Sequence, residues 1–227
     1  MQRMTAASPD YDSDPGRWRA WKPAQDVHDL VAPSLSGPVL DIGCGEGRLA
    51  SVLKPGVAWV GVDSSMTQLA GNPHRPVVQA DMNALPFRNR SFAEVTHLWC
   101  LYHLDDPVPA IAEAQRVLRP GGTYYASTAA RTNDPELVPE GYPPTSFDAE
   151  EAALLVGRVF EDAEVQRWDE KLVVLNDREE VRSYCRHHFI PAERAEQVEV
   201  PLALTKRGVL VRATASESRP SSSGSFR

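Results

Sequence analysis

The fold is decided by the stretch Val39-Leu40-Asp41-Ile42-Gly43-Cys44-Gly45-Glu46-Gly47-Arg48-Leu49-Ala50, where an apolar strand runs into a glycine turn and then into a segment of helical character. Three glycines at every second position allow a tight turn and close approach of the backbone to a ligand. A dinucleotide-binding turn needs its third glycine one residue later, where this chain has Arg48. Asp41 would also lie near a diphosphate, so the stretch favours a cationic ligand.

On both sides of this turn, apolar segments of strand length alternate with segments of helical character. Strands that read apolar on both faces and are separated by helices indicate a parallel sheet covered on each side. We therefore predict an α/β fold of the Rossmann-like, doubly wound kind, with a mostly parallel seven-stranded sheet, helices on both faces and an insertion before the last strand. The predicted strands are 38–42, 58–63, 77–81, 93–99, 122–130, 163–168 and 208–213, and the predicted helices are 24–31, 48–53, 65–70, 108–118 and 148–159.

The segments outside this pattern predict the organisation of the chain. Four prolines within 131–147 exclude regular structure there and indicate a loop at the end of the fifth strand, where open α/β sheets place ligands. The last residues are rich in serine and offer little that could pack. The prediction is an N-terminal arm or lid at 1–36, a catalytic domain at 37–213 with a substrate-covering insertion at 169–204, and a disordered tail at 214–227.

Composition narrows the classes of partner. The chain of 227 residues has 24 Lys and Arg against 31 Asp and Glu, for a net charge of −7, which argues against nucleic acid as the main partner. No stretch approaches the roughly 18 apolar residues of a membrane span, and no signal-peptide core precedes the domain, so we expect a cytoplasmic protein without membrane contact. Cys44, Cys100 and Cys185 have neither disulfide-framework nor metal-type spacing, so we expect reduced thiols and no metal site.

Further acids fall where a nucleoside-like ligand needs them. Asp63 ends the second strand, 20 residues after Gly43, from where a carboxylate reaches both hydroxyls of a ribose. Asp81 ends the third strand and can accept a hydrogen bond from an exocyclic amine, while the amide of Met82 can donate to a ring nitrogen. Each acid alone could equally be a turn or helix-cap residue. The combination favours a ligand.

In order and spacing, the motifs VLDIGCGEGRLA, GVDSS, ADMNALPF, SFAEVTHLWCLYHLDDP and EAQRVLRPGG resemble those of the class I S-adenosylmethionine-dependent methyltransferases, the small single-domain type, over roughly residues 36–130. The resemblance implies S-adenosyl-L-methionine as cofactor and S-adenosyl-L-homocysteine as product. Ala93 and Tyr102 depart from the family pattern, in which Asp and a first His are usual. The resemblance implies the following cofactor-binding residues: Asp41, Gly43, Cys44 and Gly45 near the methionine part, Asp63 with Ser64 at the ribose, Asp81 with Met82 at the adenine, and Trp99 beside the cofactor.

The expected reaction is methyl transfer to oxygen, nitrogen or carbon of a small-molecule acceptor. Such a displacement needs alignment and a dry site more than a base, because proximity alone can supply about 7–11 kcal/mol. His103, with Tyr102 beside it, is the candidate base, and its alternative is a structural residue that caps the following turn. An RNA methyltransferase and a non-catalytic, cofactor-binding regulatory protein remain open as alternatives.

The acceptor side is predicted from the segments in which the resemblance fades. We expect the arm, the loop 131–147 and the insertion 169–204 to cover the carboxyl ends of the strands. In the arm, aromatic residues could close over a sulfonium cation or simply anchor the arm, and in the insertion two adjacent histidines could be functional or only solvated. These residues are Tyr11, Arg17, Trp18, Trp21, His187 and His188.

Overall fold

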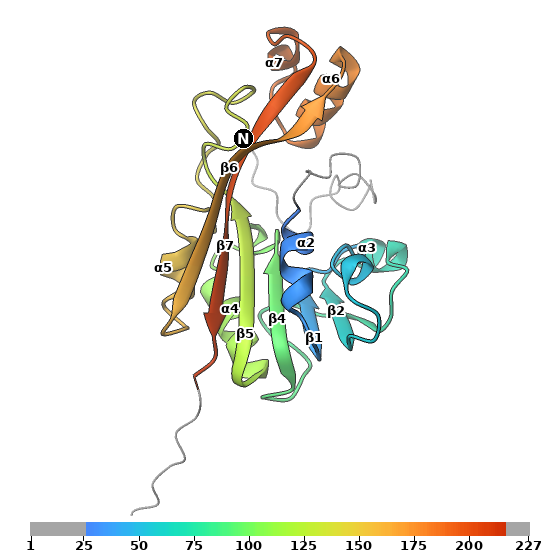
Figure 1. Cartoon of the computed structure of the whole chain (residues 1–227), viewed down its shortest axis with the longest axis vertical. Coiled ribbons are helices and arrows are strands. Elements are labelled where there is room, and N and C mark those ends of the chain that lie inside the picture. The colour runs from blue at the N-terminus through green and yellow to red at the C-terminus, as the bar shows by residue number, and fades with distance from the viewer. Residues whose placement is uncertain (1–25, 217–227) are drawn as a thin grey trace, which may run out of the picture.

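A seven-stranded sheet forms the centre of the protein, as Figure 1 shows for the computed structural model, which describes residues 26–216. Its strand order is β3-β2-β1-β4-β5-β7-β6. The first five are parallel, whereas β7 is antiparallel to both of its neighbours. The predicted fold class is confirmed. The strands are β1 (Val39–Ile42), β2 (Trp59–Asp63), β3 (Val77–Gln79), β4 (Phe92–Leu98), β5 (Leu118–Ala129), β6 (Ala163–Leu175) and β7 (Leu202–Thr214).

Helices cover both faces of the sheet. On one face, α2 (Val27–Val31) and α3 (Met66–Gly71) pack in a core that includes Val39 and Tyr125. On the other face, α4 (Val108–Val117) and α5 (Ala152–Val156) pack in a larger core that includes Leu40. Since successive residues of a strand point to opposite faces, β1 contributes Leu40 and Ile42 to one core and Val39 to the other. Both cores are therefore built on the same short strand.

Three predicted helices are shorter in the structure. The segment 48–53 forms only a 3-10 turn, η3 (Ala50–Val52), because the glycine turn continues to Leu49 and leaves too few residues to nucleate an α-helix. The helix predicted at 148–159 is reduced to α5, with Gly157 at its C-cap. The helix predicted at 24–31 begins at Val27, after the N-cap Asp26, whose side chain accepts a hydrogen bond from the His28 amide.

Two predicted strands are much longer in the structure. The strands expected at 163–168 and 208–213 extend to Leu175 and back from Leu202. Residues 202–207 of β7 pair with β6 alone, as a ribbon that continues beyond the end of β5. Most side chains of β6 are exposed, so this segment lacks the apolar alternation by which a strand is recognised. The predicted insertion 169–204 therefore begins and ends inside these strands.

The ribbon carries α6 (Arg178–His187) and α7 (Ala192–Glu196) beyond the carboxyl ends of the parallel strands (Figure 1). A third core lies here and includes Leu137 from the loop 131–147, Leu175 and Val181. We call residues 131–147 and 169–207 the cap. At the opposite end, Thr214 closes β7, and the Ala215 amide donates to Gly122 O at 2.8 Å, so these two residues are attached to the sheet and the prediction that put them in the tail is wrong. Residues 1–25 and 217–227, with the aromatic residues of the arm, lie outside the described residues.

Candidate functional site

The glycine turn after β1 is held in a left-handed backbone conformation. Gly43, Gly45 and Gly47 have φ values of +72°, +47° and +82°, which side-chain-bearing residues rarely adopt. The amides of Gly43 and Cys44 both donate to Val62 O, at 2.8 and 3.0 Å, and so attach the turn to the end of β2. The spacing of glycines in the sequence is thus a direct requirement of this backbone.

Asp63 joins the turn to the next strand end. Its Oδ2 accepts a hydrogen bond from the Gly45 amide at 2.9 Å, and its Oδ1 accepts one from the Ser65 amide at 2.9 Å. The residue is 8% exposed. Two backbone amides from different segments therefore fix the Asp63 carboxylate beside the glycine turn.

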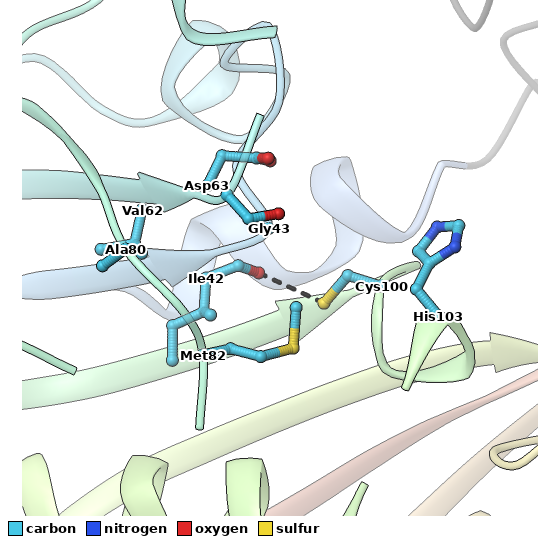
Figure 2. Close-up of a pocket in the computed structure, with 9 residues that line it drawn as sticks. Ile42, Gly43, Val62, Asp63, Ala80, Met82, Cys100 and His103 are labelled. Atoms are coloured by element: carbon cyan, nitrogen blue, oxygen red, sulfur yellow. Dashed lines mark hydrogen bonds between the residues drawn. The ribbon is translucent and has the colours of Figure 1, made fainter. Parts of the chain in front are cut away.

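A pocket opens between the carboxyl ends of β1, β2 and β4 (Figure 2). Five of the predicted site residues line it: Gly43, Asp63, Ser64, Met82 and His103. Figure 2 shows Asp63 and His103 on opposite sides of this pocket, with Met82 below them. The remaining lining residues, which the sequence interpretation did not assign, are Ile42, Val62, Ala80 and Cys100. The pocket thus combines an apolar surface with one carboxylate and one imidazole.

The unassigned lining residues have a simple origin. Ile42 and Val62 are the last or next-to-last residues of their strands, and Ala80 follows β3 directly. The position of an apolar residue at a strand end was a usable signal, because ligands bind at the carboxyl edge of such sheets. Cys100 follows the end of β4 by two residues, and its contact with Gly43 could not be read from the sequence.

Asp41 lies in the α2-side layer beneath the turn and does not line the pocket. It is 4% exposed, and the Thr96 hydroxyl donates to its Oδ1 at 2.8 Å. Burial raises the pKa of Asp41 to about 6, although hydrogen bonds from Thr96 and Trp59 and the nearby His28 act to lower it. The neighbouring Asp63 adds to the increase in pKa. Two carboxyl groups close together make this end of the sheet electronegative and favour a positively charged ligand.

The two cysteines near the turn are buried and free. The Cys44 side chain packs in the α2-side core, with its sulfur 3.8 Å from Asn72 Nδ2. The thiol of Cys100 donates to Ile42 O at 3.3 Å. Burial, followed by the charges of Asp41 and Asp63, raises the pKa of both thiols. Both thiols therefore favour the protonated form, which is a poor nucleophile.

His103 and Tyr102 lie on the 3-10 turn η4 (Leu101–His103), just after β4. Their ring centroids are 4.5 Å apart, at an interplanar angle of 53°. His103 lines the pocket, whereas Tyr102 packs against the larger core. Of this predicted pair, only the histidine faces the site, and the tyrosine supports its ring.

Three other predicted residues lie apart from the pocket lining. Asp81 is exposed, and its Oδ1 accepts hydrogen bonds from the backbone and side-chain amides of Asn83, at 2.8 and 3.1 Å, so it caps a local turn. Trp99 has a φ of +61°, and its ring meets Trp168 edge-on at 6.0 Å. In the cap, His188 stacks on Tyr184 with centroids 3.8 Å apart, and burial lowers its pKa to about 4.

The arrangement fits S-adenosylmethionine. A Cβ at Gly43 would lie 2.6 Å from Cys100 Cβ, so glycine is needed there for the strand ends to meet, and the turn leaves the adjacent pocket open. Asp63 offers carboxylate oxygens for ribose hydroxyls, and Met82 with Ala80 offers an apolar surface for a purine ring. The buried Asp41 and Asp63 suit the positive charges of the ammonium and sulfonium groups. Strand order, glycine turn and acidic strand end together define a class I S-adenosylmethionine-dependent methyltransferase domain.

Comparison with known proteins agrees with this class. Residues 40–126 match the family described as "Methyltransferase domain". The demethylmenaquinone methyltransferase of Roseiflexus castenholzii is 38% identical over 129 residues, which cover 52% of this chain and 53% of that protein. The ubiquinone/menaquinone biosynthesis C-methyltransferase of Hahella chejuensis is 31% identical over 167 residues, which cover 67% and 65%. The chain thus spans about half the length of the first of these relatives.

The likeness extends to solved structures. The YcgJ protein of Bacillus subtilis superimposes with a TM-score of 0.59 at 18% identity, over 83% of this chain and 96% of that protein. At this level of identity, the likeness concerns the fold alone. S-adenosylmethionine is the cofactor of this class of domain.

Within residues 26–216, the structure has no helix long and apolar enough to cross a membrane.

Proposed function

We propose that this protein transfers the methyl group of S-adenosylmethionine to oxygen, nitrogen or carbon of a small-molecule acceptor. The observation that carries the proposal is that Asp63, anchored to the glycine turn, lines one pocket together with His103 at the carboxyl edge of a methyltransferase-domain sheet. Cofactor-binding and candidate proton-accepting groups thereby lie on opposite sides of the same pocket.

Different residues of the pocket and the glycine turn would contact different parts of the cofactor. Asp63 accepts hydrogen bonds from the ribose hydroxyls, and Met82, Ala80 and Val62 contact the adenine. The glycine turn and the charge of Asp41 hold the methionine end. The bound cofactor supplies an electrophilic methyl group on a cationic sulfur. His103 takes up the proton that an attacking oxygen or nitrogen loses.

The choice of a small molecule as acceptor rests on three observations. The net charge of −7 disfavours polyanions. The names of the two relatives refer to methyltransferases of quinone biosynthesis. Within the described residues, the segments beyond the carboxyl ends of the strands form the cap, at the same edge of the sheet as the pocket. We extend the proposal to an acceptor site between this cap and the pocket.

Cofactor binding is tested by calorimetry with S-adenosylhomocysteine, S-adenosylmethionine and NAD. We expect the first two to bind and NAD to bind far more weakly. In Asp63→Ala, the loss of charge-assisted bonds that contribute about 1.5–3 kcal/mol each should raise the dissociation constant for S-adenosylhomocysteine more than about tenfold. NAD binding as tight as that of the sulfonium cofactor would contradict the proposal.

Asp148→Ala is the matched control for the Asp63 variant. Asp148 is also a buried aspartate, 3% exposed, but it pairs with Arg131 after the end of β5 and does not line the pocket. The two variants should lose comparable stability, whereas only Asp63→Ala should lose cofactor affinity. An unchanged dissociation constant in folded Asp63→Ala would mean that the ribose is held elsewhere.

Turnover is tested with methyl-labelled cofactor against pools of small metabolites and, separately, against RNA. Labelled small molecules are the expected product. Label in RNA would support the alternative of an RNA methyltransferase, and binding without turnover in any pool would support a regulatory cofactor-binding protein.

A further inference from the structure

Asn72 contacts the glycine turn but does not line the pocket. It forms the C-cap of α3 and is 1% exposed. Its amide Nδ2 donates to Gly45 O at 3.0 Å, and its Oδ1 accepts from the His74 amide at 2.9 Å. Neither the glycine motif nor the acidic strand ends point to this residue in the sequence.

The orientation of the Asn72 amide is determined by its two partners. The His74 N–H can only donate, so it requires the oxygen of the Asn72 side chain on its side. The nitrogen must then face the Gly45 carbonyl, which can only accept. The nitrogen also lies 3.8 Å from Cys44 Sγ, and the side chain cannot reverse without losing the bonds to Gly45 and His74.

Gly45 is consequently held from both sides. Its carbonyl accepts from Asn72, and its amide donates to Asp63 Oδ2 at 2.9 Å. Because Asp63 lines the pocket, the position of Gly45 sets the position of the carboxylate. Asn72, Gly45 and Asp63 form a continuous chain of hydrogen bonds from the end of α3 to the pocket.

Gly47 also packs closely against the Asn72 side chain. A Cβ at Gly47 would lie 2.4 Å from Asn72 Oδ1 and 2.9 Å from its Nδ2. The Asn72 side chain thus occupies the space that a larger residue at position 47 would take. The third glycine of the turn serves to admit Asn72, in addition to its positive φ of +82°.

We propose that Asn72 is a positioning residue for the cofactor: it holds the Gly45 carbonyl so that the turn and Asp63 are preorganised for the ribose and the methionine end. The inference rests on the proposed function. Preorganised groups bind more tightly because the loop need not be ordered on binding. A residue that only stabilised the fold would leave the affinity of folded protein unchanged.

The test is calorimetry with S-adenosylhomocysteine on full-length variants, after circular dichroism confirms folding. Asn72→Ala removes the hydrogen bond to Gly45 O, together with the longer contact to Cys44 Sγ, and should weaken binding about fivefold to tenfold. Asn72→Asp keeps the acceptor for His74 but replaces the donor with an oxygen that repels Gly45 O, so it should weaken binding at least as much. If Asn72→Ala does not fold, Asn72→Asp carries the test.

Asn133→Ala is the matched control. Asn133 is another buried asparagine, 6% exposed, that donates to Asp134 and accepts from the Arg207 amide in the cap. It should lose similar stability and keep wild-type affinity. Hydrogen exchange without ligand gives an independent readout: the amides of residues 43–47 should exchange faster in the Asn72 variants and not in Asn133→Ala.

The outcomes separate the two proposals. Wild-type protein that fails to bind S-adenosylhomocysteine would overturn the proposed function, and this inference with it. If the wild type binds and both folded Asn72 variants bind within twofold of it, only the positioning role is overturned. Equal losses of affinity in Asn133→Ala would likewise overturn it, because the effect would then follow stability and not position.

Discussion

At the scale of single residues, Asp41 is a carboxyl group whose burial opposes its ionisation. Burial raises its pKa from 3.8 to about 6, so the folded protein binds the Asp41 proton more tightly than the unfolded chain does. Folding is therefore favoured by this group below pH 4, and this contribution is lost as the pH rises through 6. A pKa difference of this size corresponds to about 3 kcal/mol. The ionised Asp41 near the glycine turn therefore lowers the free energy of unfolding, as is common for functional carboxylates.

The prediction concerns Asp41→Asn, which retains an acceptor for Thr96 but cannot ionise. The stability of the variant relative to wild type should rise by about 3 kcal/mol between pH 3.5 and pH 7.5, because only the wild type must keep a buried charge. Urea unfolding at a series of pH values measures this difference. Affinity for S-adenosylmethionine should fall in the same variant.

A stability difference between Asp41→Asn and wild type that stays flat over this pH range would contradict the prediction, because burial of Asp41 would then not raise its pKa in the folded protein.

At the scale of elements, the turn η4 places His103 by means of contacts made far away in sequence. The turn is closed by hydrogen bonds from the His103 and Leu104 amides to Cys100 O and Leu101 O, both at 3.1 Å. It is anchored by the fully buried Leu101 and by the Cys100 thiol, which donates to Ile42 O. Only glycine at position 43 permits Cys100 to approach so closely. The position of His103 therefore depends on β1 as well as on β4.

We predict that His103→Ala lowers turnover about 10²-fold to 10⁴-fold if the acceptor loses a proton, as is usual for a general base. The dissociation constant for S-adenosylhomocysteine should stay within about twofold of wild type, because proton transfer is needed only in the reaction. Steady-state kinetics with the acceptor identified by the turnover screen, together with calorimetry, measures both quantities. Tyr102→Phe retains the ring that supports His103 and should retain most activity. Full turnover in His103→Ala would leave His103 with a structural role only.

At the scale of the whole molecule, a buried polar cluster joins the segments of the cap to one another. Asp134 in the loop 131–147 is fully buried and accepts from Lys206 Nζ at 2.7 Å and from Tyr184 OH at 2.8 Å. Lys206 is on β7 and Tyr184 on α6, so three segments distant in sequence meet at one carboxylate. Burial and the charge of Asp134 raise the pKa of Tyr184, so its hydroxyl remains a donor. We expect the loop and the helices of the cap to move as one unit.

Lys206→Met should destabilise the protein by about 3–5 kcal/mol, because it leaves the Asp134 charge buried without its cation. The double variant Asp134→Asn/Lys206→Met should recover much of this loss, since no unpaired charge remains and asparagine tolerates the φ of +53° at position 134. Denaturant unfolding of wild type, Asp134→Asn, Lys206→Met and the double variant gives the coupling energy between the two residues.

Native-state hydrogen exchange locates the effect. Amides of α6 and of the loop 131–147 should lose protection in Lys206→Met, while those of β1 and β4 keep theirs. A uniform loss across the sheet, or a change in stability below about 0.5 kcal/mol, would show that Asp134 does not hold the cap.

The sequence predicts the central sheet well because its information is local. The glycine turn, the apolar strands around it and the helix at 108–118 carry periodic patterns that hold in any context. It predicts the cap ribbon poorly, because most side chains of β6 are exposed and the strand is specified by its pairing with β7, some 40 residues later in the chain. Likewise, η3 has helical composition but too few residues between the turn and Pro55 to form an α-helix.

The sequence by itself determined the class of fold, the glycine turn and the acidic strand end at Asp63, since residue type and spacing within one segment suffice for each. Only the tertiary structure decided which predicted residues share the pocket. It placed Met82 and His103 there with Cys100, left Asp81 capping an exposed turn, and buried Cys44 in the core. It also revealed Asn72 behind the turn. These assignments depend on which side chains face one another across different strands. Packing and strand register decide this, and neither can be read from a single segment of the sequence.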